Sequence, residues 1–427
     1  MSWPFAFFPL TDGDVAHWVG IAREVQIHNN FLTGANDQAH GPILGWTAGL
    51  VTKIAPQSFY LYNFFNLLCG MLGLGLIYFF GKKIWDEKTG RLAAFLLSTS
   101  LVFVYLSRTP MYDWAAAIFY FAFCGFYYVY LRDRNVSYLG LAMLGGAIAS
   151  LSRFSISLGL AGIFLISVNL IFRRSILLMM RDLILLACAG LVINLPWLMG
   201  QYSVHGLPFL NEFLYDNIGR FVREPGNAPI RRDYYAFVIY ALVGILPHTF
   251  CLIATVFQKG FFARFKQNSP YLTMLAAFLP CLIIFSFSGH VKLARYIAFV
   301  FPPLILLLAH QMRYYDLTNE AWRKRCGKMI LYTGVGLAAI LAMLIVQFPN
   351  EVKEAWLLAA GIIILLFGLL FFSYRAIQKH DLLIRAPETF LWPYATIYIL
   401  FFSILAYEYQ TASFLTSVRD TILAAIR

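Results

Sequence analysis

This chain of 427 residues consists, from end to end, of long apolar runs that are separated by mostly short polar loops. A helix needs about 20 consecutive apolar residues to cross the hydrocarbon core of a bilayer. Only 13% of the residues are charged, against about 25% in soluble domains. We therefore predict an all-α polytopic membrane protein, with spans at about 57–80, 91–107, 111–131, 137–152, 155–171, 182–199, 234–256, 271–288, 295–311, 329–347, 355–373 and 389–407.

Basic residues gather in alternate loops, which indicates the topology. Examples are "GKKIWDEKTGR", "RDRN", "RRSILLMMRD", "QKGFFARFKQ" and "EAWRKRCGK". Loops of this kind face the cytoplasm, so the other loops face outward, to the side that is the periplasm if the membrane is a bacterial inner membrane. Because the net charge of +12 is spread over these loops, a nucleic-acid groove is excluded. We expect one integral membrane domain over 1–427, with about 12–13 transmembrane helices and no soluble C-terminal domain.

Two of the loops on the periplasmic side are long, at 12–56 and 200–233. The first contains "DVAHWVGIAREVQIHNN" and the second "PFLNEFLYDNIGRFV" (208–222), and in both the apolar residues recur at helical spacing. Amphipathic helices of this kind lie in the membrane interface. Two such helices on one side predict a cavity at the periplasmic surface.

Two aspartates stand at the edges of apolar segments on this same side. Asp14 precedes the first amphipathic stretch, and Asp113 lies just inside a span. An acid next to hydrocarbon is a functional candidate, although Asp14 also fits an N-cap and Asp113 fits compensation of a helix dipole. Two converging carboxylates could deprotonate a hydroxyl, hold a divalent cation or orient a basic acceptor.

A cationic cluster marks the segment "FSFSGHVKLARYIAFVFPP", again on the periplasmic side. His290, Lys292 and Arg295 flank the start of a span, and Tyr296 follows at once. Lysine and arginine bind phosphate well, whereas the alternative is ordinary snorkelling at the interface. Arg220 adds positive charge to the second long loop. We interpret this group as a phosphate site.

Other polar residues carry weaker signals. His40 fits a loop residue, and we expect His248 to make a hydrogen bond between helices, because no second histidine stands at metal spacing. The six cysteines lie in apolar runs or a basic loop and predict neither a disulfide framework nor a zinc site. Arg153 fits either a partner for an acid in the bundle or a short outward turn.

Four stretches, in this order, resemble the C-type membrane glycosyltransferases that use polyprenyl-phosphate sugars. They are "DVAHWVGIAREV", "SRTPMYD", "NLPWLMGQYSVHGLPFLNEFLYDNIGRF" and "FSFSGHVKLARYIAFVFPPLILLLAH". The nearest groups are the lipid A aminoarabinose and galacturonic acid transferases and the protein O-mannosyltransferase relatives. The resemblance places the catalytic aspartate on Asp14 and a second acid on Asp113, with Arg23 and Glu24 in the opening motif.

Some family features differ in this sequence. Val15 stands where the family has Glu, and Asp12 is the substitute that we expect. A Glu-Lys-Pro motif and a zinc-holding His of the aminoarabinose enzymes correspond here to Ala39-His40-Gly41 and Asp216-Asn217. The metal is therefore unassigned: the sequence requires no cofactor, and a divalent cation is compatible with the acids.

The resemblance implies transfer of a hexose or pentose from a polyprenyl-phosphate carrier to an envelope acceptor, with lipid A or the lipopolysaccharide core favoured. Asp14 would act as general base with Asp113 in support, and His40 is a further candidate of the first loop. The alternatives are a protein O-glycosyltransferase, a scaffold, and a flippase for a lipid-linked sugar. A flippase predicts charged residues near the bilayer midplane, whereas these candidates gather at one face.

Overall fold

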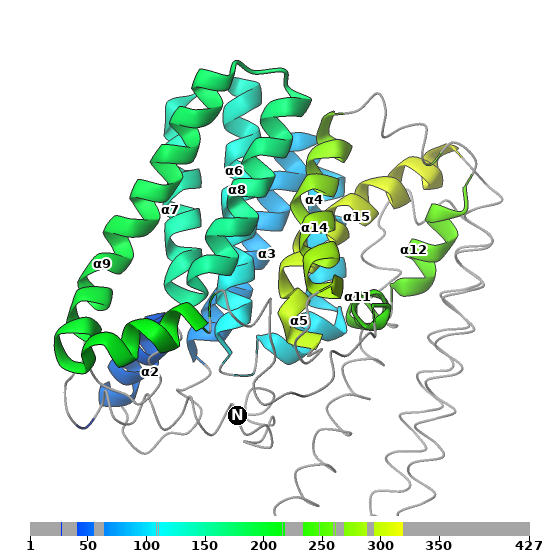
Figure 1. Cartoon of the computed structure of the whole chain (residues 1–427). Helices are drawn as coiled ribbons and strands as arrows, with labels where there is room; N and C mark the ends of the chain where they lie inside the picture. Colours follow the sequence, from blue (N-terminus) through cyan, green and yellow to red (C-terminus); the bar gives the residue numbers. More distant parts are fainter. Residues whose placement is uncertain are drawn as a thin grey trace, which may run out of the picture.

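The computed structural model describes residues 41–54, 64–107, 111–215, 234–246, 248–258, 269–287 and 294–318, together with the single residues 27, 109, 217 and 261. These parts of the chain are helical and contain no strand (Figure 1). Six of the helices are long and apolar enough to cross a membrane, and Val136–Ser152 is a shorter apolar helix. The predicted all-α multi-pass membrane fold is confirmed.

The helices follow one another along the chain with short connections. Their bounds are α2 Ile43–Ile54, α3 Phe64–Ile84, α4 Glu87–Ser98, α5 Leu101–Leu106, α6 Tyr112–Asp133, α7 Val136–Ser152, α8 Phe154–Ile171, α9 Ile176–Leu214, α11 Ala236–Gly244, α12 Thr249–Val256, α14 Ser269–Phe287, the 3₁₀ helix η4 Ala294–Val300 and α15 Phe301–Thr318. The spans predicted at 329–347, 355–373 and 389–407, and the amphipathic helix after Asp14, lie outside the described residues.

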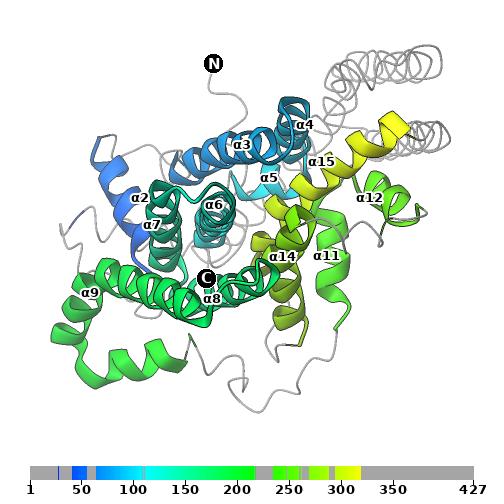
Figure 2. The same cartoon turned by 90° about the horizontal axis from the view of Figure 1, so that it is seen from above.

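Helix α6 forms the centre of the bundle. Figure 2 shows it enclosed by α3, α7, α8 and α14, and 89% of its most apolar 18-residue stretch is buried inside the protein. Its large side chains Trp114, Phe121 and Phe123 are almost fully buried, and the Tyr120 hydroxyl donates to the Ala277 carbonyl of α14 at 2.8 Å. Helix α9 is peripheral, because only 17% of its most apolar 18-residue stretch is buried. The bundle thus holds the start of α6 in a fixed place.

Two glycines allow α3 and α4 to pack backbone against backbone. A Cβ atom on Gly81 would lie 2.5 Å from the Cα of Gly90, and a Cβ on Gly90 would lie 2.5 Å from the Tyr78 carbonyl oxygen. Small residues at such crossings are typical of membrane helices, because association there depends on close packing. Any larger residue at either position would separate the two helices.

Two predicted spans are interrupted in the structure, which corrects the continuous helices expected at 91–107 and 234–256. The first is divided into α4 and α5, and the second into α11 and α12. The interruptions meet: the Thr99 hydroxyl hydrogen-bonds His248 Nε2 at 2.8 Å, and the Leu101 amide donates to the Leu246 carbonyl at 2.9 Å. Each interruption satisfies polar groups of the other. The hydrogen bond predicted for His248 is confirmed.

Helix α9 continues to Leu214, so it contains both the span predicted at 182–199 and the first part of the amphipathic helix predicted in 208–222. It is kinked at Gly206, whose φ of 61° and ψ of −142° belong to a region of backbone conformation that is almost restricted to glycine. After the kink the chain runs across the lower end of the bundle, close to α2 (Figure 1). Phe209 and Phe213 there pack against Trp197. Helix α2 is an addition, because no helix was expected in the second half of the 12–56 loop.

Candidate functional site

Asp113 lies in the first turn of α6 and is the starting point of the site. Met111 adopts an extended conformation, and the helix begins at Tyr112. The carboxylate therefore sits at the positive end of the helix dipole, which favours its charge. Only 1% of Asp113 is exposed, and the dipole alone does not compensate a charge that is removed from solvent. Asp113 needs cationic partners.

Arg153 provides the closest partner. It stands between α7 and α8 in an extended conformation, with φ of −136° and ψ of 92°, so its side chain projects from the junction of two helices. Its Nε lies 2.7 Å from Asp113 Oδ1. The guanidinium carbon lies 4.4 Å from the Tyr112 ring centre and 4.9 Å from the Tyr296 ring centre, and Nη2 donates to the Tyr112 hydroxyl at 3.0 Å. Arg153 is thus held by one carboxylate and two aromatic rings.

Arg295 completes the group from the opposite side. It is buried in η4, and its Nε lies 3.6 Å from Asp113 Oδ2. Its guanidinium carbon is 5.6 Å from the ring centre of Tyr296. We call Asp113, Arg153 and Arg295, with Tyr112 and Tyr296, the Asp113 cluster. Two arginines against one carboxylate leave it with one surplus positive charge.

The carboxylate of the Asp113 cluster retains capacity to accept hydrogen bonds. Neither oxygen of Asp113 accepts one, and Arg153 Nε donates none, because the ion pairs are close but poorly aligned for hydrogen bonding. Buried polar atoms without hydrogen bonds are rare and call for an explanation. Burial acts to lower the pKa of Arg153, but Asp113 and the neighbouring tyrosines outweigh it, so this pKa is raised. The surplus positive charge of the cluster suits an anionic group, and the unused carboxylate oxygens suit hydroxyl donors of a polar ligand.

A second set of contacts fixes the segment beside the Asp113 cluster. The Ser155 hydroxyl donates to the Asn217 backbone carbonyl at 2.8 Å and lies 3.0 Å from its Oδ1, while the Ser155 amide donates to the same Oδ1 at 3.3 Å. The Phe154 and Phe213 rings also pack together, with centres 5.5 Å apart. The start of α8 and the chain after α9 are therefore joined two residues from Arg153.

The sequence-based candidates divide into two groups. The structure brings Asp113, Arg295 and Tyr296 together in the Asp113 cluster. The remaining candidates lie outside the described residues: Asp12, Asp14, Arg23, Glu24, His40, Arg220, His290 and Lys292. Within the described ranges, no three His, Cys, Asp or Glu side chains are grouped to hold a metal ion.

Arg153 is the member of the Asp113 cluster that sequence reasoning left open. The structure decides for the first of its two readings, an arginine that pairs with an acid of the bundle. The available signal was that an arginine between two apolar spans needs a partner. The sequence could not show which acid this was, because 40 residues and two helices separate the pair. Tyr112 was not singled out, since an aromatic residue beside an apolar run is common.

Comparison with known proteins identifies the architecture. ArnT from Cupriavidus metallidurans, in a crystal structure bound to undecaprenyl phosphate, superposes with a TM-score of 0.73 at 16% identity, over 92% of this chain and 72% of that one. The chain has the fold of ArnT. The apo structure of ArnT agrees, with a TM-score of 0.70 at 17% identity over 94% of this chain and 73% of that one. The resemblance to C-type membrane glycosyltransferases is thus confirmed at the level of the fold.

Sequence comparison adds one family match and one relative. Residues 39–199 match the family described as dolichyl-phosphate-mannose-protein mannosyltransferase, and this segment contains Asp113 and Arg153. An uncharacterized protein of Aquifex aeolicus (strain VF5) is 24% identical over 314 residues, which are 72% of this chain. The chain spans 59% of the length of that relative.

Proposed function

We propose that the protein is a glycosyltransferase that moves a sugar from a polyprenyl-phosphate carrier to an envelope acceptor, at the periplasmic face of a bacterial inner membrane. The Asp113 cluster carries this proposal: a buried carboxylate with unused acceptors sits between two arginines at one end of the bundle. Its surplus positive charge suits a phosphate, and its free acceptors suit sugar hydroxyls. The ArnT fold supports the choice, because one ArnT structure contains undecaprenyl phosphate.

The donor phosphate would contact the cationic side of the site. Arg295 is placed for this role, and we expect Lys292, Arg220 and His290 to contribute, with Tyr296 orienting Arg295. When the bond between the anomeric carbon and the phosphate oxygen breaks, its electron pair remains on the phosphate. Fixed cations stabilise the negative charge that develops there. The leaving group is free polyprenyl phosphate.

The acceptor hydroxyl would be activated by Asp14. Its oxygen attacks the anomeric carbon from the face opposite the phosphate, so the configuration inverts, and the proton passes to the Asp14 carboxylate. Asp113 supports this step by accepting hydrogen bonds from the sugar. Asp12, Arg23, Glu24 and His40 would shape the first loop around Asp14. A divalent cation held by the acids is the alternative way to orient the acceptor.

Lipid A or the lipopolysaccharide core is the acceptor that we favour, on the resemblance to the aminoarabinose and galacturonic acid transferases. A protein acceptor is the second candidate, because residues 39–199 match a family described by protein mannosylation. Both acceptors offer the nucleophile that the mechanism requires. They differ in size and chemistry, so an assay with both acceptors distinguishes them.

The test uses purified full-length protein and a donor that carries a radiolabelled sugar. The protein is incubated with donor alone, with lipid A and with a serine-rich peptide, and free polyprenyl phosphate and labelled acceptor are measured. We expect release of polyprenyl phosphate with lipid A, in step with labelling of the acceptor. A flippase would leave the donor bond intact. Movement of intact donor across vesicles without any release, for every acceptor, would overturn the proposal.

A further inference from the structure

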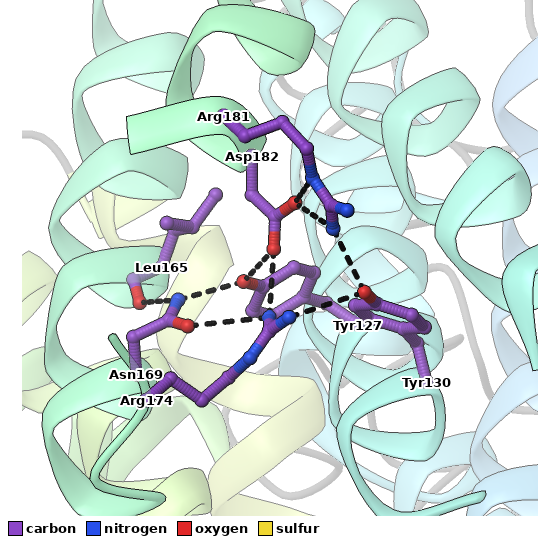
Figure 3. A network of polar contacts seen from close by, with 7 residues as sticks. All are labelled: Tyr127, Tyr130, Leu165, Asn169, Arg174, Arg181 and Asp182. Atoms are coloured by element: carbon purple, nitrogen blue, oxygen red, sulfur yellow. Dashed lines mark hydrogen bonds and ion pairs between the residues drawn. The ribbon is translucent and has the colours of Figure 1, made fainter. Parts of the chain in front are cut away.

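A second buried carboxylate lies at the opposite end of the bundle, where the basic loops gather. Figure 3 shows Asp182, which is fully buried near the start of α9, between two arginines. Arg174 Nη1 lies 2.8 Å from its Oδ2, and Arg181 Nη2 lies 2.6 Å from its Oδ1. The Tyr127 hydroxyl donates to Oδ2 at 2.8 Å. The carboxylate is thus fully satisfied by groups of the protein.

Neutral side chains complete this network and connect α6, α8 and α9. Asn169 Nδ2 donates to the Tyr127 hydroxyl at 2.6 Å. The Tyr130 hydroxyl accepts from Arg174 Nη2 at 3.2 Å and from Arg181 Nη2 at 2.9 Å. With two arginines and one carboxylate, the network holds one surplus positive charge. Arg174 is the inner partner of Asp182, and Arg181 joins the same network from a more exposed position through Asp182 and Tyr130.

Arg181 offers a free binding group to the outside. Its Nε and Nη2 form hydrogen bonds with Asp182 and Tyr130, whereas Nη1 has no hydrogen bond or ion pair with a described residue (Figure 3). The side chain is 46% exposed. Because its inner edge is fixed by Asp182 and Tyr130, the outer nitrogen is held in place before any ligand arrives, and a preorganised donor binds at lower entropic cost.

Arg173 adds a second exposed cation, in the connection before α9 and eight residues before Arg181. It is exposed and adopts a positive φ of 50° at the connection between α8 and α9. Its side chain has no hydrogen bond or ion pair with the described part of the chain, in contrast to Arg174 beside it. Arg173 and Arg181 are therefore available to a ligand, while Arg174 is engaged inside.

The surface next to Arg181 is apolar and faces away from the bundle. Exposed side chains continue along α9 from this point, namely Leu177, Met180, Ile184, Leu185, Leu191 and Val192. In a multi-pass membrane protein such a face contacts lipid tails. Arg181 lies five residues after the start of α9 at Ile176, about 8 Å along the helix axis. The headgroup layer on each side of a bilayer is about as thick, so a helix that begins at the membrane surface places this position near the headgroups.

We propose that Arg181 and Arg173 form a binding site for the phosphate of an anionic phospholipid, whose acyl chains lie along the exposed face of α9. The charge of the site selects this occupant. A second copy of the chain would have to offer an anionic surface to these arginines, whereas the face of α9 that continues from Arg181 is apolar. A zwitterionic lipid offers a phosphate but also a cationic group that these arginines repel.

The test measures lipid binding by the purified full-length protein in detergent. Phosphatidylglycerol and phosphatidylcholine with identical acyl chains are compared by native mass spectrometry and by thermal unfolding, with inorganic phosphate as a third addition. We expect phosphatidylglycerol to bind more tightly and to raise the unfolding midpoint more than the other two. An arginine near an anionic surface contributes about 1 kcal/mol, which is about fivefold in binding, so Arg181→Gln and Arg173→Gln should each weaken phosphatidylglycerol by about that factor.

Two variants make the outcome decisive. Arg173→Gln leaves the Asp182 network intact, so its loss of binding is not explained by misfolding. Arg91→Gln, an exposed arginine on α4 that pairs with Glu87, is the control and should bind phosphatidylglycerol as the wild type does. The proposal is overturned if Arg173→Gln and Arg181→Gln both bind phosphatidylglycerol normally, if inorganic phosphate stabilises equally, or if stabilisation follows protein concentration instead of lipid.

Discussion

At the residue scale, Arg153 illustrates how one side chain is fixed by several weak contacts. The ion pair with Asp113 and the two tyrosine rings act on the same guanidinium. Lysine would keep the charge, but it has no planar face for the rings and no fork for the carboxylate. Replacing Arg153 by lysine therefore removes its ring contacts and its paired hydrogen-bonding geometry while keeping its charge.

The first prediction concerns Arg153→Lys. We expect turnover to fall about tenfold and the free energy of unfolding to fall by about 1–2 kcal/mol, because desolvated stacking of a guanidinium on an aromatic ring contributes at that level. Turnover of labelled donor and thermal unfolding measure the two effects. Activity and stability equal to those of the wild type would show that the charge alone matters.

The second prediction compares two buried arginines, Arg295 in η4 and Arg313 in α15. Arg295→Gln should raise the KM for donor tenfold or more, since a hydrogen bond to a charged group contributes about 1.5–3 kcal/mol. Arg313, near the C-terminal end of α15, is buried to a similar degree. Arg313→Gln is the control and should leave the KM of the folded protein unchanged. An equal rise in KM in both variants would contradict a phosphate contact at Arg295.

Sequence reasoning located individual charged residues better than it located their partners. Asp113 and Arg295 were recognisable because each lies at the edge of an apolar run, where a charge needs a reason. That Arg153 joins them depends on how α6, α7, α8 and η4 pack, and no spacing rule contains this information. The catalytic role of Asp14 stays a prediction, as it lies outside the described residues.

At the scale of elements, the kink in α9 determines where the chain crosses the end of the bundle. Gly206→Ala should lower the free energy of unfolding by about 1–3 kcal/mol, the cost of a side chain in a conformation that favours glycine. Gly159→Ala on α8 is the control, because a Cβ there meets no atom within 4 Å, and it should be neutral or stabilising. Thermal unfolding of both variants decides. Equal midpoints would show that the kink straightens without cost.

The turn between α3 and α4 permits a prediction about pH. Partial burial acts to raise the pKa of Asp86, but hydrogen bonds from the backbone and hydroxyl of Thr89 outweigh it, so this pKa is lowered. A carboxylate with a lowered pKa stabilises the folded state at neutral pH and loses this effect as pH falls through the folded pKa. Asp86→Ala should cost about 1 kcal/mol at neutral pH. The difference from wild type should shrink in acid, and a constant difference would contradict the assignment.

The elements were predicted well where one apolar run makes one helix, as in α7 and α8. They were predicted poorly where a run is divided. Polar Ser98, Thr99 and Ser100 mark the first interruption and Pro247 lies in the second, but such residues also occur inside spanning helices, and each interruption is stabilised by the other. The helix predicted in the second long loop is present as far as Leu214, after the kink at Gly206, and Phe209 and Phe213 on its apolar face are buried against Trp197.

At the scale of the whole molecule, the bundle carries a buried carboxylate at each end. Asp113 has two arginines and unused acceptor oxygens, whereas Asp182 has two arginines and every acceptor occupied. The same residue types thus serve two purposes. The Asp182 network ties helices together and leaves only the outer edge of Arg181 for a ligand, whereas the Asp113 cluster leaves its carboxylate oxygens for one.

The most direct test of the Asp113 cluster compares Asp113→Asn with Asp133→Asn, which alters the other end of the same helix. Release of free polyprenyl phosphate from sugar-loaded donor is measured per folded protein. Removal of a preorganised group at a reacting centre costs about 10²–10³-fold in rate, so we expect a loss of this size for Asp113→Asn and near-normal release for Asp133→Asn. Near-normal release by a folded Asp113→Asn variant would contradict the account.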